Sequence, residues 1–347
     1  MAKTKPTMKS IAEELGVSRS TVSFVLGGEA ERRRINPETA QRIFQRALEL
    51  GFKPNYFAQA LNNRKTGAIG LVFPDVHEIY MSQMLRGIDA VFANHDTTMM
   101  LSSSRMDRAV EMRNIESLLY RGIDGLIIVP CADFNSRPTP VPALAAMLEG
   151  NNIPVVCADR IPDGWLGSSV VQDDRSNARL AVELLIDQGA ERVACVSFDL
   201  DASSIRGRIA GYQDALKMRG LRADPRCLIL LDRVDAKSQD LSCAVHALLS
   251  LPAHERPDAW FVTTEGLSYR TRDLLLGQSP VGEAPPPIAR FGADPAHYSS
   301  GMISVYQPHY DIGQRSAELL FKHMHDPALC STQIVVASPQ EPVEELL

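Results

Sequence analysis

The sequence has 347 residues, of which 45% are hydrophobic and 22% are charged, and its formal net charge is −6. This length allows two or three domains, and the composition is typical of a globular chain rather than a disordered or fibrous one. No apolar run reaches the about 18 residues that a membrane span needs, so we expect no membrane partner. Residues 1–65 hold 12 of the 36 Lys and Arg but only 6 of the 42 Asp and Glu. We therefore expect the basic N-terminal segment, but not the acidic remainder of the chain, to bind a polyanion.

The cysteines and the first residues indicate the compartment. None of the six cysteines forms a C-x-x-C pair or lies near a histidine at metal-ligand spacing, and most stand in apolar runs such as "VVCAD" and "VACVS". This usage predicts buried, reduced thiols and no metal site. The segment "MAKTKPTMKS" has no apolar stretch behind its charges, so we expect no secretory leader. Both features favour a cytoplasmic protein.

The N-terminal segment predicts three short helices. "MKSIAEEL" (8–15) carries its apolar residues on one side, and Gly16 then ends the helix. Ser18 is a favoured N-cap for a second helix, and Asn36 before a proline begins a third. Two short helices joined by a glycine turn form a helix-turn-helix, the motif that places its second helix in the DNA major groove.

The rest of the chain begins with a linker. Residues 54–67 are helical in pattern but too short to form a stable helix alone. From residue 68, apolar runs such as "AIGLVF", "GLIIV" and "AWFV" alternate with helical patterns, which implies βαβ units and parallel sheets. The predicted fold class is α/β with an N-terminal all-α head. The break at "DRIPDGWLGSS" (159–169) favours two doubly wound lobes over one large sheet.

Several motifs together carry a family resemblance. The segments "MKSIAEELGVSRSTVSFVL", "LGFKPNYFAQAL", "IGLVFPD", "GIDGLII", "PVVCADR", "VVQDDRSNARLAVELLIDQGAERVACVS" and "RIAGYQDAL" follow one another over essentially the whole chain. In this order the chain resembles the LacI/GalR family of bacterial transcription regulators. The resemblance implies a regulator, expected to be a repressor, that binds a pseudo-palindromic operator in double-stranded DNA as a homodimer. It also implies control by a small-molecule effector, a carbohydrate or related metabolite.

The resemblance also divides the chain. It implies a helix-turn-helix domain over 1–53, a hinge helix and linker over 54–67, and a two-lobed periplasmic-binding-protein-like core over 68–347 for effector binding and dimerisation. The first lobe is expected to span about 68–160 and 293–325, and the second about 161–292 and 326–347. Because the chain ends without a leucine heptad tail, we expect a dimer rather than a tetramer.

The second helix carries the residues expected to contact DNA. Arg19 can bind guanine O6 and N7 together, and Ser20 is short enough to touch a base edge. We expect Ser18, Thr21 and Ser23 at phosphates. The resemblance adds a phosphate contact at Thr7 and hinge contacts at Asn55, Ala58 and Leu61, with Leu61 as a minor-groove wedge.

Two departures from the family pattern concern this head. Family members usually carry Arg where this chain has Phe24, and Asn where it has Gly27. Phe24 cannot read guanine, but it can press on a thymine methyl or pack beneath the helix. The longer loop that follows contains Arg32-Arg33-Arg34, which we interpret as phosphate contacts, with a solvated charged turn as the alternative.

The resemblance also names an effector site between the lobes. Polar or aromatic residues at strand ends or family pocket positions are its candidates: Asp75, Tyr80, Met81, Asp159, Arg208 and Asp294. The family's "GFDD" motif is replaced here by "RFGADPAHY", and its "AND" turn by "TTE". These two changes leave the chemistry of the effector open.

Other functions are less well supported by the sequence. G-x-S-x-G, H-E-x-x-H, Walker A and G-x-G-x-x-G motifs are all absent, so we expect no catalytic residues, no enzyme activity and no cofactor. One alternative is a regulator of the same family whose core binds a protein co-regulator or no small ligand. A more distant alternative is a solute-binding protein, which would share the body but would lack the basic head.

Overall fold

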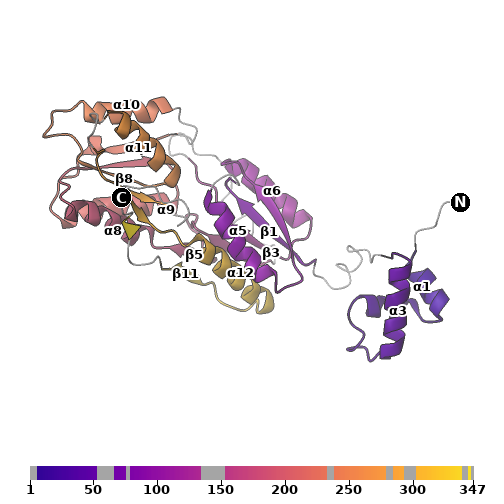
Figure 1. The fold of residues 1–347 in the computed structure, drawn as a ribbon. Coiled ribbons are helices and arrows are strands. Elements are labelled where there is room, and N and C mark those ends of the chain that lie inside the picture. The colour runs from indigo at the N-terminus through magenta and orange to yellow at the C-terminus, as the bar shows by residue number, and fades with distance from the viewer. Residues whose placement is uncertain are drawn as a thin grey trace. The chain divides into compact units, whose positions relative to one another are not determined.

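The structure is a computed structural model that describes residues 6–52, 66–75, 79–133, 153–232, 238–278, 284–292, 302–337 and 343–344 (Figure 1). The chain forms two compact units, Met1–Thr66 and Gly67–Leu347. We call the first unit the head and the second the body. Among the described residues, no helix is both long enough and apolar enough to cross a membrane.

The head is a small three-helix domain. Helices α1 (Met8–Leu15), α2 (Arg19–Leu26) and α3 (Pro37–Glu49) pack around a core that includes Ile11, Val22, Val25 and Ile43. Gly16 ends α1 with a left-handed φ of 65°, as glycines at helix C-termini commonly do. This conformation allows the tight turn between α1 and α2. The expected helix-turn-helix therefore forms.

The first lobe of the body contains a parallel six-stranded sheet in the order β11-β5-β4-β3-β1-β2. Its strands are β1 (Ala68–Phe73), β2 (Thr98–Ser103), β3 (Gly125–Ile128), β4 (Val155–Ala158), β5 (Ser168–Gln172) and β11 (Gln333–Val336). Successive side chains of a strand point to opposite faces. Ile69 and Leu71 accordingly face α5 (Ile79–Phe92) and α12 (His309–His325), whereas Val72 faces α6 (Arg108–Tyr120).

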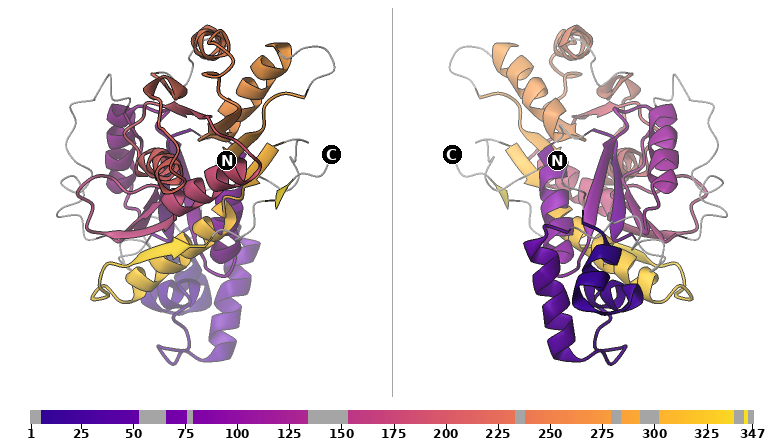
Figure 2. Two further views of the ribbon diagram at one scale, coloured as in Figure 1. Left: turned by 90° about the vertical axis from the view of Figure 1, so that its left-hand side faces the viewer. Right: turned by 90° about the vertical axis from the view of Figure 1, so that its right-hand side faces the viewer.

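The second lobe repeats this plan, with a sheet and helices of its own (Figure 2). The order of its strands is β12-β10-β9-β8-β6-β7. Its parallel strands are β6 (Val193–Phe198), β7 (Leu228–Leu231), β8 (Ala259–Val262), β9 (Ile288–Phe291) and β10 (Met302–Val305), and β12 (Val343–Glu344) is antiparallel. Helices α8 (Asp174–Asp187) and α9 (Ser203–Met218) cover one face. Helices α10 (Ser238–Leu249) and α11 (Glu265–Gln278) cover the other.

The predicted α/β class with two lobes is confirmed, but strand pairing moves the expected lobe boundaries. Strands β5 and β11 belong to the first sheet, although the expected division put residues 161–172 and 333–336 in the second lobe. Strand β10 belongs to the second sheet, although 302–305 was expected in the first. The segment 159–169 is a connection within the first lobe. Among the described elements, the chain therefore crosses between β5 and α8, between β10 and α12, and between β11 and β12.

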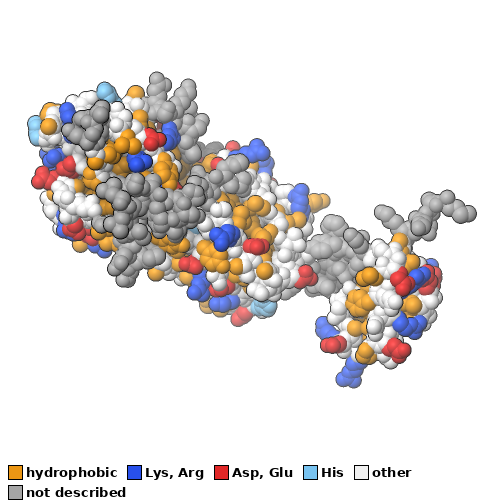
Figure 3. Space-filling view, viewed as in Figure 1, with side chains coloured by type: hydrophobic (Ala, Val, Ile, Leu, Met, Phe, Trp, Pro, Cys, Tyr) orange, Lys and Arg blue, Asp and Glu red, His pale blue; other side chains and the backbone are white. Residues whose placement is uncertain are grey.

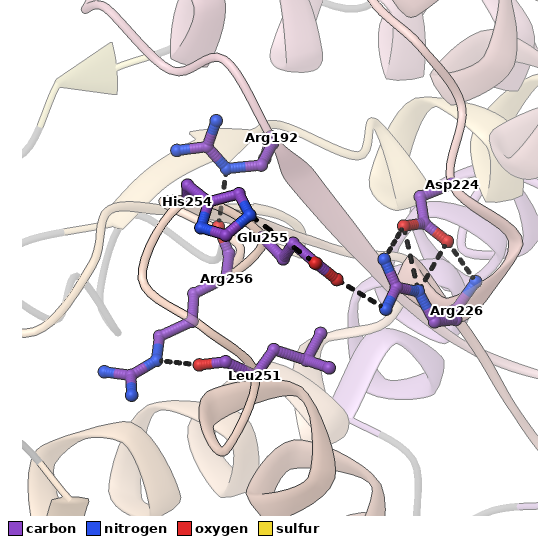
Figure 4. A network of polar contacts seen from close by, with 7 residues as sticks. All are labelled: Arg192, Asp224, Arg226, Leu251, His254, Glu255 and Arg256. Atoms are coloured by element: carbon purple, nitrogen blue, oxygen red, sulfur yellow. Dashed lines mark hydrogen bonds and ion pairs between the residues drawn. The ribbon is translucent and has the colours of Figure 1, made fainter.

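A polar network ties together surface segments of the second lobe (Figure 4). Arg226, in the short 3-10 helix η1 (Pro225–Cys227), donates hydrogen bonds to Asp224 and to Glu255. Arg192 Nε donates to the carbonyl oxygen of Arg256 at 2.8 Å. Exposed ion pairs of this kind add little stability each. The network holds the segment after α10 against the neighbouring strands and lies apart from the candidate site described below.

The six cysteines are all free thiols, and four are buried. The buried ones are Cys131, Cys157, Cys195 and Cys227. Burial raises the pKa of the Cys131 thiol to about 12. The reduced form expected from the sequence therefore agrees with the structure for these four residues.

Helices α5 and α12 approach each other closely at two glycines. A Cβ atom added to Gly87 would overlap the carbonyl oxygen of Tyr310, and one added to Gly313 would overlap that of Met84. Backbone atoms cannot move aside as a flexible side chain can. These glycines therefore set how near the two helices lie on the first sheet.

A buried carboxyl group joins α6 to the end of the same sheet. Glu111 is 4% exposed, and both of its carboxylate oxygens accept hydrogen bonds from Cys131 N, at 3.1 and 3.0 Å. Burial raises its pKa to about 7, although the Cys131 N–H and the charges of Arg108 and Arg160 act in the opposite direction. The folded state therefore favours the protonated form.

The glycine contact gives a stability prediction. Gly87→Ala should lower the free energy of unfolding by about 1–3 kcal/mol, because the added methyl group forces the helices apart. Gly266→Ala is the matched control, since apart from its own helix turn no described atom lies within 4 Å of its added Cβ in α11. Thermal or urea unfolding measures both. Equal stability of the two variants would show that α5 and α12 can separate without cost.

The buried carboxyl group gives a pH prediction. A group with a raised folded-state pKa contributes stability below its unfolded pKa, about 4.3 here, and loses it as pH rises through the folded value. Glu111→Gln, which stays neutral, should therefore gain up to about 3 kcal/mol over the wild type between pH 5 and pH 8. Exposed Glu116 on the same helix supplies the control Glu116→Gln. Parallel unfolding curves of wild type and Glu111→Gln across this range would contradict the prediction.

Candidate functional site

The first turn of α2 presents a polar surface on the head. Ser18 is the N-cap, and its Oγ accepts a hydrogen bond from Thr21 N at 3.0 Å. The same Oγ lies 2.7 Å from Ser20 Oγ and 2.8 Å from Thr21 Oγ1. Arg19 and Ser20 are exposed, and the Arg19 side chain has no hydrogen bond or ion pair with any described residue. An unengaged guanidinium therefore stands at a helix N-terminus beside three hydroxyl groups.

The expected phosphate-contacting residues also have structural roles. Thr7 caps α1 in a capping box, since its Oγ1 accepts from Ser10 N at 3.1 Å and Ser10 Oγ bonds back to Thr7. Such caps stabilise a helix by about 1 kcal/mol. Both Thr7 and Ser18 therefore fix the helix ends besides being candidates for DNA contact.

The remaining predicted head residues divide into two groups. Ser23 and Phe24 lie on α2, both half-buried, and the Arg33 guanidinium lies over the Phe24 ring. Asn55, Ala58 and Leu61 lie outside the described residues. In Figure 3, basic and acidic side chains are interspersed on the visible face of the head.

In the body, a first polar cluster lies where β4 ends. Asp159 is buried, has a left-handed φ of 65°, and lies 3.7 Å from His309 Nε2 and 3.3 Å from Arg160 Nε. The His309 ring, at the start of α12, lies 4.9 Å from the Tyr80 ring. Burial alone would raise the pKa of Asp159, but His309, Arg160 and Arg208 together lower it to about 2.

A second cluster forms around Arg208 on α9. Its Nε donates to Asp174 Oδ1 at 2.7 Å, and its Nη1 donates to the carbonyl oxygen of Thr263 at 2.6 Å. The guanidinium also lies 4.1 Å over the Phe291 ring, a cation–π arrangement. Gln172 Nε2 donates to the same Asp174 oxygen at 2.9 Å. Burial raises the pKa of Asp174, although Arg208 opposes the shift.

The two clusters form one site. Strands β4, β5, β8 and β9 end beside them, at the carboxyl edge where open α/β sheets bind ligands. The two clusters also lie near enough to interact electrostatically, since the charge of Arg208 contributes to the lowered pKa of Asp159. The lobes also touch nearby, through the hydrogen bonds from Asp201 N to Asp133 O at 2.8 Å and from Ile161 N to Ser203 Oγ at 2.9 Å.

Among the buried polar atoms of this region, three oxygens form no hydrogen bond within the described part of the chain. They are Asp159 Oδ1, Gln172 Oε1 and Thr264 Oγ1. Buried polar groups in native proteins almost always have partners. The arrangement therefore suits a ligand that supplies hydroxyl or amine donors.

The structure unites some of the sequence-predicted ligand residues. Asp159 and Arg208 come together, and Tyr80 joins them through His309. Met81 is 1% exposed and belongs to the hydrophobic core of the first lobe, so it does not face the polar clusters. Asp75 follows β1 and is half-buried, and Asp294 lies outside the described residues.

Sequence reasoning missed four residues of the site. They are Gln172, Asp174, Phe291 and His309. The available signal was their position, since three of them end or closely follow a buried strand. Among the described residues, no group of three or more His, Cys, Asp and Glu side chains could hold a metal ion.

Comparison with known proteins matches both units. Residues 7–55 match the family described as bacterial regulatory proteins, lacI family. Residues 66–265 match periplasmic binding proteins and sugar binding domain of LacI family. The chain is 28% identical over 339 residues to catabolite control protein A of Priestia megaterium, covering 94% of this chain and 95% of that protein. It is also 28% identical over 329 residues to the ribose operon repressor of Escherichia coli K12, covering 93% and 94%.

Solved structures share the fold. The lac repressor dimer bound to operator and the anti-inducer ONPF is 19% identical, with a TM-score of 0.78 over 96% of this chain and 97% of that one. The complex of the transcriptional regulator CelR with cellobiose is 22% identical, with a TM-score of 0.66 over 96% and 98%. The curated relatives named above are transcriptional regulators rather than enzymes. With its helix-turn-helix head and its two-lobed body, this chain belongs to the LacI family of DNA-binding transcriptional regulators.

Proposed function

We propose that the protein is a cytoplasmic repressor that binds a pseudo-palindromic operator as a homodimer. We further propose that it responds to a neutral polyhydroxy compound, a carbohydrate or close analogue, held between the lobes of the body. The proposal rests on two features that occur in the same chain. The head has an exposed Arg19 at a capped helix N-terminus, and the body has a buried polar site at the ends of its strands.

The head supports sequence-specific binding. Arg19 extends from the first position of α2, where the recognition helix of a helix-turn-helix meets base edges. Ser20 is short and exposed, so the backbone can approach DNA closely. Two-fold symmetric operators are read by two heads, which is why we propose a dimer.

The body supports a neutral ligand. The positive charge of Arg208 is already balanced by Asp174. Arg208 is therefore available to a ligand as a hydrogen-bond donor rather than as an uncompensated charge. Asp159, likewise ionised and beside Arg160 and His309, can accept hydrogen bonds from ligand hydroxyls. The unpartnered Gln172 Oε1 and Thr264 Oγ1 add further sites. A phosphorylated or carboxylated ligand would bring a negative charge next to both aspartates.

Control of DNA binding follows from the position of this site. Asp159 belongs to the first lobe and Arg208 to the second, so one ligand that contacts both changes how the lobes close. An effector shifts an equilibrium only by its difference in affinity for the two states. We propose that lobe closure is the state difference that the ligand senses and that the hinge transmits to the head.

DNA recognition is tested by selection from random-sequence duplexes with the full-length protein. We expect enrichment of an inverted repeat, with affinity that falls linearly against the logarithm of salt concentration. Arg19→Ala should weaken binding to the selected site by roughly 5- to 150-fold and relax the preference at one base in each half-site. Arg42→Ala removes an exposed charge from α3 and should leave base preference unchanged. Enrichment of no inverted repeat by the wild type would overturn the proposal.

Ligand recognition is tested by thermal shift with neutral sugars and their phosphorylated counterparts. A neutral sugar at 100 times its Kd should stabilise the protein by about 2.7 kcal/mol and should change operator affinity. Asp159→Asn should remove the shift, whereas Asp163→Asn, at a side chain that is 75% exposed, should keep it. A shift that survives Asp159→Asn would place the ligand elsewhere. The absence of any shift would favour a core that binds a protein co-regulator.

A further inference from the structure

Phe24 occupies a reading position of α2 without the means to read guanine. Ser20 and Phe24 are four residues apart on the helix, so their side chains lie on one face. A phenyl ring neither donates nor accepts the hydrogen bonds that distinguish guanine. At the position where members of this family usually carry arginine, the helix itself therefore supplies no guanidinium.

The loop after α2 brings an arginine to this position. Glu29 N donates to the carbonyl oxygen of Phe24 at 2.8 Å, and Arg33 N donates to that of Glu29 at 2.9 Å. These bonds fold the loop back toward the helix. As a result, the guanidinium carbon of Arg33 lies 4.4 Å from the centre of the Phe24 ring. A cation over an aromatic face at this distance is attracted to it.

A carboxylate fixes the direction of this guanidinium. Arg33 Nε donates to Glu29 Oε2 at 3.2 Å, and no described residue accepts from either Nη atom of Arg33. The Arg33 side chain is 51% exposed. The two Nη groups therefore form a free edge, while the Nε side and one face of the group are held by Glu29 and Phe24.

The neighbouring arginines lack this arrangement. Arg32 and Arg34 are exposed, and within the described ranges neither side chain forms a hydrogen bond, an ion pair or a ring contact. Of these three adjacent arginines, Arg33 is the one whose guanidinium is held in a fixed orientation by contacts among the described residues. A phosphate contact needs only charge, whereas base reading needs a held donor pair.

We propose that Arg33 is a guanine-reading residue of this protein and that Phe24 is its positioning residue. The Nη1 and Nη2 groups donate to O6 and N7 of one guanine in the major groove, and the Phe24 ring holds the guanidinium in place. The reading surface is then a composite of α2 and the loop behind it. This inference rests on the proposed operator binding.

The test measures Kd for the wild type, Arg33→Ala and Arg34→Ala on the selected operator and on its single-base variants. Arg33→Ala should weaken binding to the operator by roughly 5- to 150-fold. It should also make one guanine in each half-site interchangeable with other bases. Arg34→Ala, which removes the same charge one residue away, should weaken all these sequences alike. Arg33→Lys, which keeps the charge but not the donor pair, should lose the guanine preference as well.

The role of Phe24 is tested by Phe24→Leu, which keeps apolar packing but removes the ring. It should weaken the preference for the guanine that Arg33→Ala identifies, and Arg33→Ala in its background should add little. Circular dichroism of each variant verifies the head fold, and if Phe24→Leu unfolds the head, Phe24→Tyr should preserve the preference. A Phe24→Leu protein with unchanged guanine preference would remove Phe24 from the proposal.

Two results would overturn the role of Arg33. One is a uniform loss of affinity over all sequences together with a salt slope lowered by about one, which marks a phosphate contact. The other is the same selected consensus from wild type and Arg33→Ala. Both results leave the enrichment of an inverted repeat and the effect of Arg19→Ala intact, so they are distinct from failure of the proposed operator binding.

Discussion

The buried guanidinium of Arg208 holds together the elements on which the body's site depends. It donates hydrogen bonds to Asp174 at the start of α8 and to the carbonyl oxygen of Thr263, the residue after β8. It also lies over the ring of Phe291 on β9. Each of these elements comes from a different part of the sequence. Removing one partner of a buried ion pair strands the other charge, at a cost of about 3–5 kcal/mol. The second lobe therefore cannot rearrange at this point without breaking a well-satisfied network.

The first lobe meets this network with a less satisfied one. Asp159 is buried beside Arg160 and His309, yet its Oδ1 accepts no hydrogen bond from the described residues. Arg208 therefore fixes much of the second lobe's side, whereas unpartnered oxygens remain on both sides, at Asp159 and Gln172 in the first lobe and at Thr264 in the second. Preorganisation on one side lowers the ordering cost of binding.

Local features of the sequence predicted local structure well. The caps Ser18 and Asn36, the turn at Gly16 and the alternation of strands with helices all appear in the structure. Their signals depend on a few neighbouring residues. The helix-turn-helix and the α/β class could therefore be predicted without the family resemblance.

Pairing across long distances could not be predicted in the same way. The segments "SSVVQ" (β5) and "MISVYQ" (β10) do not indicate which sheet each strand joins. Their partners, β11 for β5 and β9 for β10, lie elsewhere in the chain. Asp174 in "VVQDDRSN" looks like a helix-capping residue, and only the fold brings Arg208 to it. Arg33 likewise resembles its neighbours in sequence, since its contact with Phe24 depends on how the loop turns back.

The glycine crossing of α5 and α12 has a mechanical consequence for the body. The chain reaches α12 from β10 of the other lobe, yet α12 is fixed against α5 with backbones in direct contact at Gly87 and Gly313. Two helices locked in this way cannot slide along each other by small side-chain adjustments. Relative motion of the lobes is then taken up at the segments that cross between them, of which 306–308 is the one that leads into α12. His309, the first residue beyond that segment, lies 3.7 Å from Asp159, so this crossing is physically linked to the polar site.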